Sequence, residues 1–96
     1  MENIRKRYEA LIRLMNMDNV NNPIVRDPDK LDLIETDRLN AKCLYDLNFF
    51  EEARRVGERD KIILRQFTAL SFKGLNTSVR SRYERLAREI RNSREN

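Results

Sequence analysis

The sequence predicts an all-α fold: one small domain of four to five helices, with a helix-turn-helix-like pair at its C-terminal end. The 96 residues are enough for one domain and too few for two. Only two glycines and two prolines are present, whereas folds with many turns need more of both. Apolar side chains recur at steps of three and four, as on one face of a helix. We expect a single domain over 1–96, with an N-terminal helix (1–17), central helices (27–72) and a basic C-terminal helix (77–92).

The N-terminal segment is predicted to be a helix followed by a loop. Over residues 2–17 the apolar side chains share one helical face: Ile4, Tyr8, Leu11, Ile12 and Met15. The asparagine-rich stretch NMDNVNNP (16–23) that follows predicts a loop. A short helix should begin at Asp27-Pro28, because aspartate accepts hydrogen bonds from amides at a helix start and proline loses no bond there.

Two longer helices are predicted in the centre of the chain. The first follows a cap at Thr36 or Asp37 and runs to about residue 56. Its apolar stripe is wide, which favours burial on two sides, and comprises Leu39, Cys43, Leu47 and Phe50 flanked by Leu44, Tyr45 and Phe49. The second covers 59–72. Gly57 and Gly74 are predicted to end these two helices as C-caps.

The last predicted helix has one apolar and one basic face. Thr77 or Ser78 is expected to cap it. The apolar face carries Val79, Tyr83, Leu86, Ala87 and Ile90. At about 100° per residue, five arginines span the opposite side: Arg80, Arg82, Arg85, Arg88 and Arg91. Together with the preceding helix and its glycine-bearing turn, this segment has the order of a helix-turn-helix.

The arginines are open to two interpretations. A solvated helix face must be charged, and most charge runs have no further role. Three details favour nucleic-acid binding instead. Only Glu84 and Glu89 dilute the positive charge, the cations are arginines that match phosphate bidentately, and the polar start at 76–78 is typical of phosphate-binding helix ends. The candidate phosphate contacts are Lys73, Arg80, Arg82, Arg85, Arg88 and Arg91.

Charge is distributed unevenly along the chain. Residues 18–37 hold two basic and six acidic side chains, whereas 61–96 hold nine basic and three acidic ones. The acidic segment fits capping and solubility roles, or a contact with the basic tail of a neighbouring copy in a ring. A second basic patch near the N-terminus is a further candidate for the same polyanion: Arg5, Lys6, Arg7 and Arg13.

The composition argues against several kinds of site. Histidine is absent, so neither a four-ligand Cys/His zinc site nor a histidine-assisted nucleophile can be built. The single Cys43 allows no internal disulfide, lies on an apolar face where core packing is expected, and suits a reducing, cytoplasmic setting. No apolar run is long enough for a membrane helix or a secretory signal. We expect no enzymatic activity, no cofactor, no metal and no membrane partner.

From about Glu35 onwards the chain resembles one family of phage terminase small subunits. In that family a helix leads into Gly-Leu-Thr-Pro-(small)-Ser-Arg with another arginine close behind. The stretch GLNTSVRSR (74–82) matches at Gly74, Leu75, Arg80 and Arg82. It departs where Asn76-Thr77 replaces Thr-Pro and Val79 replaces serine, and the family's Asn-Pro loop is missing at 57–60. The resemblance implies a ring-forming helical protein that binds viral DNA for packaging and passes it to a large ATPase–nuclease subunit.

Two other functions are compatible with the sequence. The first is a protein-interaction module, such as an adaptor or an inhibitor of a nucleic-acid-processing enzyme, whose basic helix docks on an acidic protein. Its candidate apolar anchors are Leu44, Tyr45, Phe49 and Phe50, which bundle core explains equally well. A structural virion component is the third possibility. For the DNA-binding protein a homo-oligomer is expected.

Overall fold

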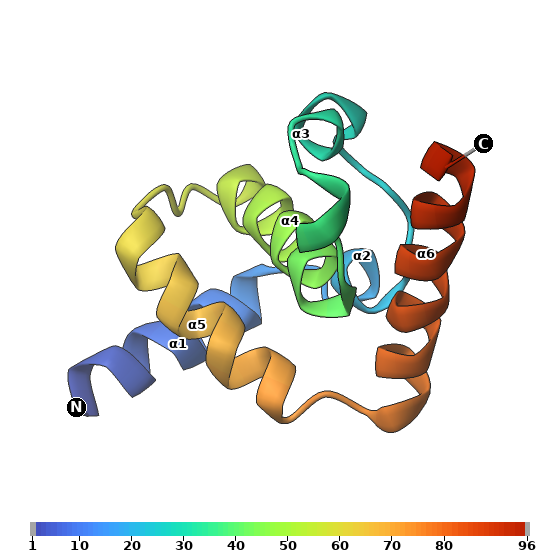
Figure 1. The fold of residues 1–96 in the computed structure, drawn as a ribbon. Helices are drawn as coiled ribbons and strands as arrows, with labels where there is room; N and C mark the ends of the chain where they lie inside the picture. The colour runs from blue at the N-terminus through green and yellow to red at the C-terminus, as the bar shows by residue number, and fades with distance from the viewer. Residues whose placement is uncertain (1, 96) are drawn as a thin grey trace.

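A computed structural model describes residues 2–95 and confirms a small, single, all-helical domain. Figure 1 shows its six α-helices, with no strand in the described part of the chain. The helix beyond the predicted four to five is the single-turn α2, which lies in the stretch predicted to be a loop. The elements are α1 (Glu2–Leu14), α2 (Asp18–Asn21), α3 (Pro28–Asp32), the 3-10 helix η1 (Thr36–Arg38), α4 (Ala41–Arg55), α5 (Lys61–Lys73) and α6 (Thr77–Glu95).

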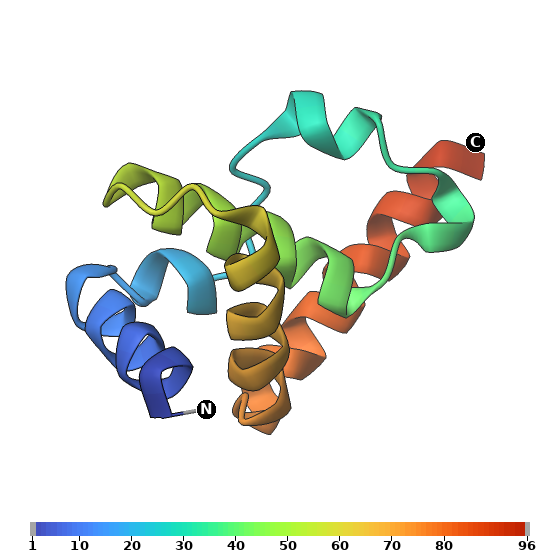
Figure 2. The same cartoon turned by 90° about the vertical axis from the view of Figure 1, so that its left-hand side faces the viewer.

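Helix α4 lies at the centre, and α5 and α6 both pack on it (Figures 1 and 2). The short helices α2 and α3 also pack on α4. At the other side, α1 contacts α5 through an edge-to-face pair between Tyr8 and Phe67, whose ring centroids are 5.3 Å apart. The ends of the described chain lie at opposite sides of the molecule (Figure 1).

The core is centred on aromatic side chains from three helices. Tyr45 of α4 lies 5.5 Å from the rings of both Phe72 and Tyr83 and 6.1 Å from Phe49, centroid to centroid. Such pairs contribute about 0.5–1.5 kcal/mol each beyond the burial of their area. Aliphatic side chains from all parts of the described chain complete the core, among them Leu11, Met15, Val20, Leu31, Leu39, Leu44, Ala53, Leu64, Val79 and Ala87.

The buried face of α4 differs from the predicted stripe. Leu44, Tyr45 and Phe49 are buried, whereas Cys43, Leu47 and Phe50 are only partly buried. The face is completed by two buried polar residues, Asn48 and Glu52, which the predicted apolar stripe did not include. With these two residues included, the buried residues of α4 recur at steps of three and four, as on one face of a helix. The core position expected for Cys43 is therefore wrong.

The helix starts confirm one predicted cap and correct two. Asp27 caps α3, accepting a hydrogen bond from the Lys30 amide at 3.1 Å. Asn40, rather than Thr36 or Asp37, caps α4 through the Cys43 amide at 2.9 Å. Asn76, rather than Thr77 or Ser78, caps α6. In each case a short side chain just before the helix reaches an otherwise unbonded amide.

The two glycines end their helices differently. Gly57 has φ of 102°, the left-handed conformation predicted for a C-cap glycine. Gly74 is the C-cap of α5, as predicted, but its φ of −91° is one that any residue can adopt. The predicted loop at 16–23 also contains α2, which forms because the fully buried Val20 holds this segment against α4.

Candidate nucleic-acid interface

The connection between α5 and α6 is as short as in a helix-turn-helix pair, but each of these helices packs mainly on α4 and not on the other. Three residues separate the helices, and from this turn α5 and α6 diverge along different sides of α4 (Figures 1 and 2). Asn76 Oδ1 accepts a hydrogen bond from the Ser78 amide at 2.7 Å, which fixes the start of α6. This cap already occupies one of the amides expected to hold a phosphate at the helix start.

Arg80 fastens the turn from the side of α6. Its guanidinium donates a hydrogen bond to the carbonyl oxygen of Phe72 at 2.8 Å and lies 4.7 Å from the centroid of the Phe72 ring. A cation over an aromatic face and a charge-assisted hydrogen bond both stabilise this geometry. Arg80 therefore acts as a structural link between the two helices, and its contact with a phosphate stays a prediction.

The buried face of α6 is rotated relative to the predicted one. Val79, Tyr83 and Ala87 are buried, while Leu86 and Ile90 are only partly so. The rotation toward Ala87 brings three arginines to the edge of the buried face: Arg80, Arg91 and Arg94. The guanidinium groups of these three arginines donate hydrogen bonds to backbone carbonyl oxygens.

At the C-terminal end of α6, two of these arginines bind the segment between α3 and α4. Arg91 donates a hydrogen bond to the carbonyl oxygen of Leu39. Arg94 donates to the carbonyl oxygens of Leu31 and Ile34, at 2.9 and 2.7 Å. Figure 2 shows this segment beside the end of α6. Arg91 therefore has a structural contact within the chain, and its contact with a phosphate stays a prediction.

These contacts also change the interpretation of the acidic segment. The basic end of α6 meets it within the same chain, through backbone carbonyls and not through carboxylates. Asp29, Asp32, Glu35 and Asp37 stay exposed. Among residues 2–95, no three acidic or cysteine side chains gather in an arrangement that could hold a metal ion.

Three arginines remain on the outward face of α6. Arg82, Arg85 and Arg88 are exposed and form no hydrogen bond or ion pair with any residue from 2 to 95. Lys73, next to the turn, is also exposed. The acids Glu84 and Glu89 are exposed on the same helix, one turn from Arg88 and Arg85 respectively. The positive charge is thus concentrated in the first three turns of α6.

The second basic patch lies on a different part of the molecule. Arg5, Lys6 and Arg13 are exposed on α1, whereas Arg7 forms an ion pair with Glu58 at 2.9 Å. Figures 1 and 2 place α1 and α6 on opposite sides, so this patch does not continue the face of α6. Of the four anchors proposed for a protein-interaction module, Leu44, Tyr45 and Phe49 are buried in the core, and only Phe50 is partly exposed.

A buried carboxylate network escaped the sequence analysis. Glu52 is fully buried and accepts hydrogen bonds from the Asn16 amide at 2.7 Å, Asn19 Nδ2 at 2.9 Å and Arg55 Nη2 at 2.6 Å. Arg26 adds a fourth donor at 3.3 Å. The adjacent Arg55 guanidinium lowers the pKa of Glu52 to about 2. The network holds the α1–α2 connection and the loop at Arg26 against α4, so its role is structural.

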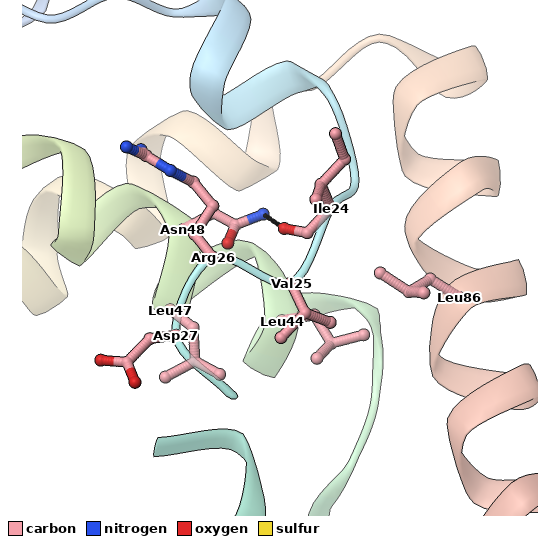
Figure 3. A pocket seen from close by; sticks show the side chains of 8 residues that line it. All are labelled: Ile24, Val25, Arg26, Asp27, Leu44, Leu47, Asn48 and Leu86. Carbon is pink, nitrogen blue, oxygen red and sulfur yellow. Dashed lines mark hydrogen bonds between the residues drawn. The ribbon is translucent and has the colours of Figure 1, made fainter. Parts of the chain in front are cut away.

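The small cavity between the 24–27 loop, α4 and α6 is too small for a ligand. Figure 3 shows Asn48 Nδ2 donating to the carbonyl oxygen of Ile24, and Leu86 pointing in from α6. The cavity volume is about 10 Å³. That is close to the minimum for a single water molecule. Side chains of the loop, α4 and α6 fill most of the space between these elements, so the cavity offers no binding site.

Comparison with known proteins identifies no relative: no family model, no curated protein and no solved structure matches this chain. Within residues 2–95, no helix is both long and apolar enough to cross a membrane. The functional conclusion therefore depends on the geometry of the surface.

Proposed function

We propose that this chain is a non-enzymatic protein that binds duplex DNA through the outward face of α6. One observation carries the proposal. Arg82, Arg85 and Arg88 follow one another at steps of three along an exposed helix face, and none has a partner within residues 2–95. Each guanidinium can form paired hydrogen bonds with a phosphate group. Lys73 adds a fourth positive charge at the turn.

The position of α6 supports this proposal. A helix that follows a short turn and is held on a second helix is the arrangement in which helix-turn-helix proteins insert their second helix into the major groove. The groove is about 12 Å wide and admits an α-helix. Because Arg82, Arg85 and Arg88 all lie in the first three turns of α6, this part of the helix is expected to lie closest to the DNA.

Packaging of phage DNA is the setting that we propose for this binding. It follows from the resemblance of Gly74-Leu75 and the two following arginines to terminase small subunits, and it includes a homo-oligomer and a large ATPase–nuclease partner. Size-exclusion chromatography with light scattering, with and without duplex DNA, tests this part. A monomer in both conditions would contradict the proposed oligomer.

The DNA-binding test compares two triple variants with equal loss of charge. One is Arg82→Gln/Arg85→Gln/Arg88→Gln, and the control is Arg5→Gln/Lys6→Gln/Arg13→Gln on α1. We expect the α6 variant to lose at least about tenfold in affinity. The slope of log affinity against log salt concentration should also become less steep by about 2.7, because each lost phosphate contact removes about 0.9 from the slope. The α1 control variant should keep most of its affinity for DNA and most of the salt dependence of that affinity.

Two outcomes would contradict the proposal. Equal losses in the two variants would indicate a response to net charge alone. Binding indifferent to salt would exclude phosphate contacts. Retention of an acidic protein by α6, with no retention on DNA, would favour the protein-interaction module instead.

A further inference from the structure

A second basic site lies where the C-terminal end of α4 meets the N-terminal end of α5. A pocket of about 220 Å³ opens there, bounded by α3, α4, the 56–60 turn and α5. Figures 1 and 2 place this turn at the end of α4 that lies away from α6. The pocket is lined by Lys30, Phe50, Arg54, Glu58, Arg59, Lys61 and Leu64.

The charge of the pocket is strongly positive. Four cations line it, and Arg54, Arg59 and Lys61 have no hydrogen-bond or ion-pair partner within residues 2–95. Lys30 Nζ lies 3.9 Å from Asp27 Oδ2, a long contact that leaves its charge largely available. The lining therefore concentrates positive charge without an internal counter-ion for three of its four cations.

Both acids of this corner are committed to other groups. Glu58, the one carboxylate in the lining, accepts a hydrogen bond from Arg7 Nη2 of α1 at 2.9 Å. Asp60 caps α5, accepting from the amides of Ile62 and Ile63 at 3.1 and 3.3 Å. Neither carboxylate forms an ion pair with Arg54, Arg59 or Lys61, and the four cations of the lining outnumber its one acid, so an external dianion would find a net positive site.

The floor of the pocket is apolar. Leu64 is buried, and Phe50 is partly buried with its remaining surface toward the pocket. A cationic rim above an apolar floor suits a ligand with a charged end and an apolar body. We propose that the pocket binds a small phosphate monoester, with its phosphate between Arg54, Arg59 and Lys61 and its apolar group against Phe50 and Leu64.

The volume restricts the size of this ligand. Pockets for drug-sized molecules usually enclose about 300–1,000 Å³. The pocket here, at about 220 Å³, admits a phosphate with one ring or a short chain, and excludes a dinucleotide. This proposal does not depend on DNA binding by α6, because the two sites share no residue.

Phenyl phosphate is a suitable probe, with inorganic phosphate and phenol as the charge-only and ring-only controls. Amide shifts in an NMR titration at constant ionic strength give both affinity and location. We expect phenyl phosphate to saturate one site and to shift amides over 54–64. It should bind at least about tenfold more tightly than inorganic phosphate, because its ring buries apolar surface. Phenol should not bind measurably.

Matched variants separate the pocket from general charge effects. Arg54→Gln/Arg59→Gln should lose at least tenfold in affinity for phenyl phosphate, whereas Arg5→Gln/Arg13→Gln should stay within twofold of the parent. The triple variant of α6 should also bind the probe normally while losing DNA, so the two proposals fail separately. Should the pocket double variant not fold, Arg59→Gln alone decides, since Arg59 is exposed in the turn.

The proposal is overturned by any of three results. The first is a shift that does not saturate. The second is equal affinity for phenyl phosphate and inorganic phosphate, which would leave no role for the apolar floor. The third is an equal loss in the pocket variant and the α1 control.

Discussion

Asn48 on α4 donates a hydrogen bond to the hydroxyl oxygen of Tyr83 on α6, with 2.8 Å between Nδ2 and the oxygen. Tyr83 in turn donates to the carbonyl oxygen of Val20, and Asn48 also donates to that of Ile24 at 2.9 Å. Two buried side chains thus join the basic helix, the central helix and the 20–24 segment. Burial raises the pKa of Tyr83 to about 12, so the hydroxyl keeps its proton at neutral pH.

Replacing Tyr83 by phenylalanine should destabilise the fold by about 1–3 kcal/mol, because the Val20 carbonyl loses its donor and Asn48 loses an acceptor in the interior. Chemical denaturation measures the change. Tyr8→Phe is the matched control: its ring packs on Phe67, and its hydroxyl bonds to nothing within residues 2–95. A loss of similar size in both variants would show that the buried pair has no special role.

The pattern of apolar residues was sufficient to predict the positions of most helices, but it was insufficient to predict the buried face of the central helix α4. Helices α3, α5 and α6 were predicted close to their observed positions, since local caps and periodic apolar side chains determine them. The inner face of α4 includes Asn48 and Glu52, whose partners lie far away in the sequence, at Ile24 and Asn16. No local pattern marks a polar residue as buried when its hydrogen bonds come from distant segments.

The same limit applies to the arginines. A helical wheel gives the angle of each side chain but not which other segment returns to that side of the helix. Arg91 and Arg94 face inward because the 31–39 segment folds back on α6. The pocket at Arg54 and Arg59 was likewise invisible, since it forms only when α3 lies over the turn after α4.

Glu52→Gln should destabilise the protein by about 1.5–3 kcal/mol at neutral pH, because the buried amide that it introduces replaces one acceptor oxygen by a donor and loses the charge-assisted hydrogen bonds that Glu52 accepts. The neighbouring Glu51, which accepts no hydrogen bond from residues 2–95, is the control. Glu51→Gln should change stability by less than about 0.5 kcal/mol. Urea denaturation measures the stability of both variants. Equal losses of stability in the two would show that the Glu52 network is not important for the fold.

The dependence of stability on pH should also report on Glu52. Its pKa falls from 4.5 to about 2 on folding, so the unfolded chain binds the proton more tightly. The stabilisation is therefore complete above about pH 4.5 and is lost as the pH falls to about 2. The stability difference between the parent and Glu52→Gln should shrink across this window, which separates Glu52 from other carboxyls. A difference that stays constant from pH 5 to 2 would contradict the lowered pKa.

The two glycines should respond in opposite directions to alanine. Gly57 has φ of 102°, and no atom lies within 4 Å of an added Cβ, so Gly57→Ala should cost about 1–2 kcal/mol through backbone strain alone. Gly74 has φ of −91°, and an added Cβ would meet the Leu70 carbonyl oxygen at an ordinary 3.9 Å. Gly74→Ala should therefore be neutral or stabilising by up to about 1 kcal/mol. Melting temperatures of the pair test this, and a stabilised Gly57→Ala would show that the turn is built differently.

Arg94→Gln should release the segment between α3 and α4. The substitution removes charge-assisted hydrogen bonds to the carbonyl oxygens of Leu31 and Ile34, and should cost about 1–3 kcal/mol. Because these bonds fasten the segment to the last turns of α6, amide hydrogen exchange over 28–38 should accelerate more than exchange in the core of α4. Arg88→Gln on the outward face of the same helix should leave both stability and exchange unchanged. If exchange over 28–38 were equally slow in Arg94→Gln and Arg88→Gln, the arginine would not be what holds this segment in place.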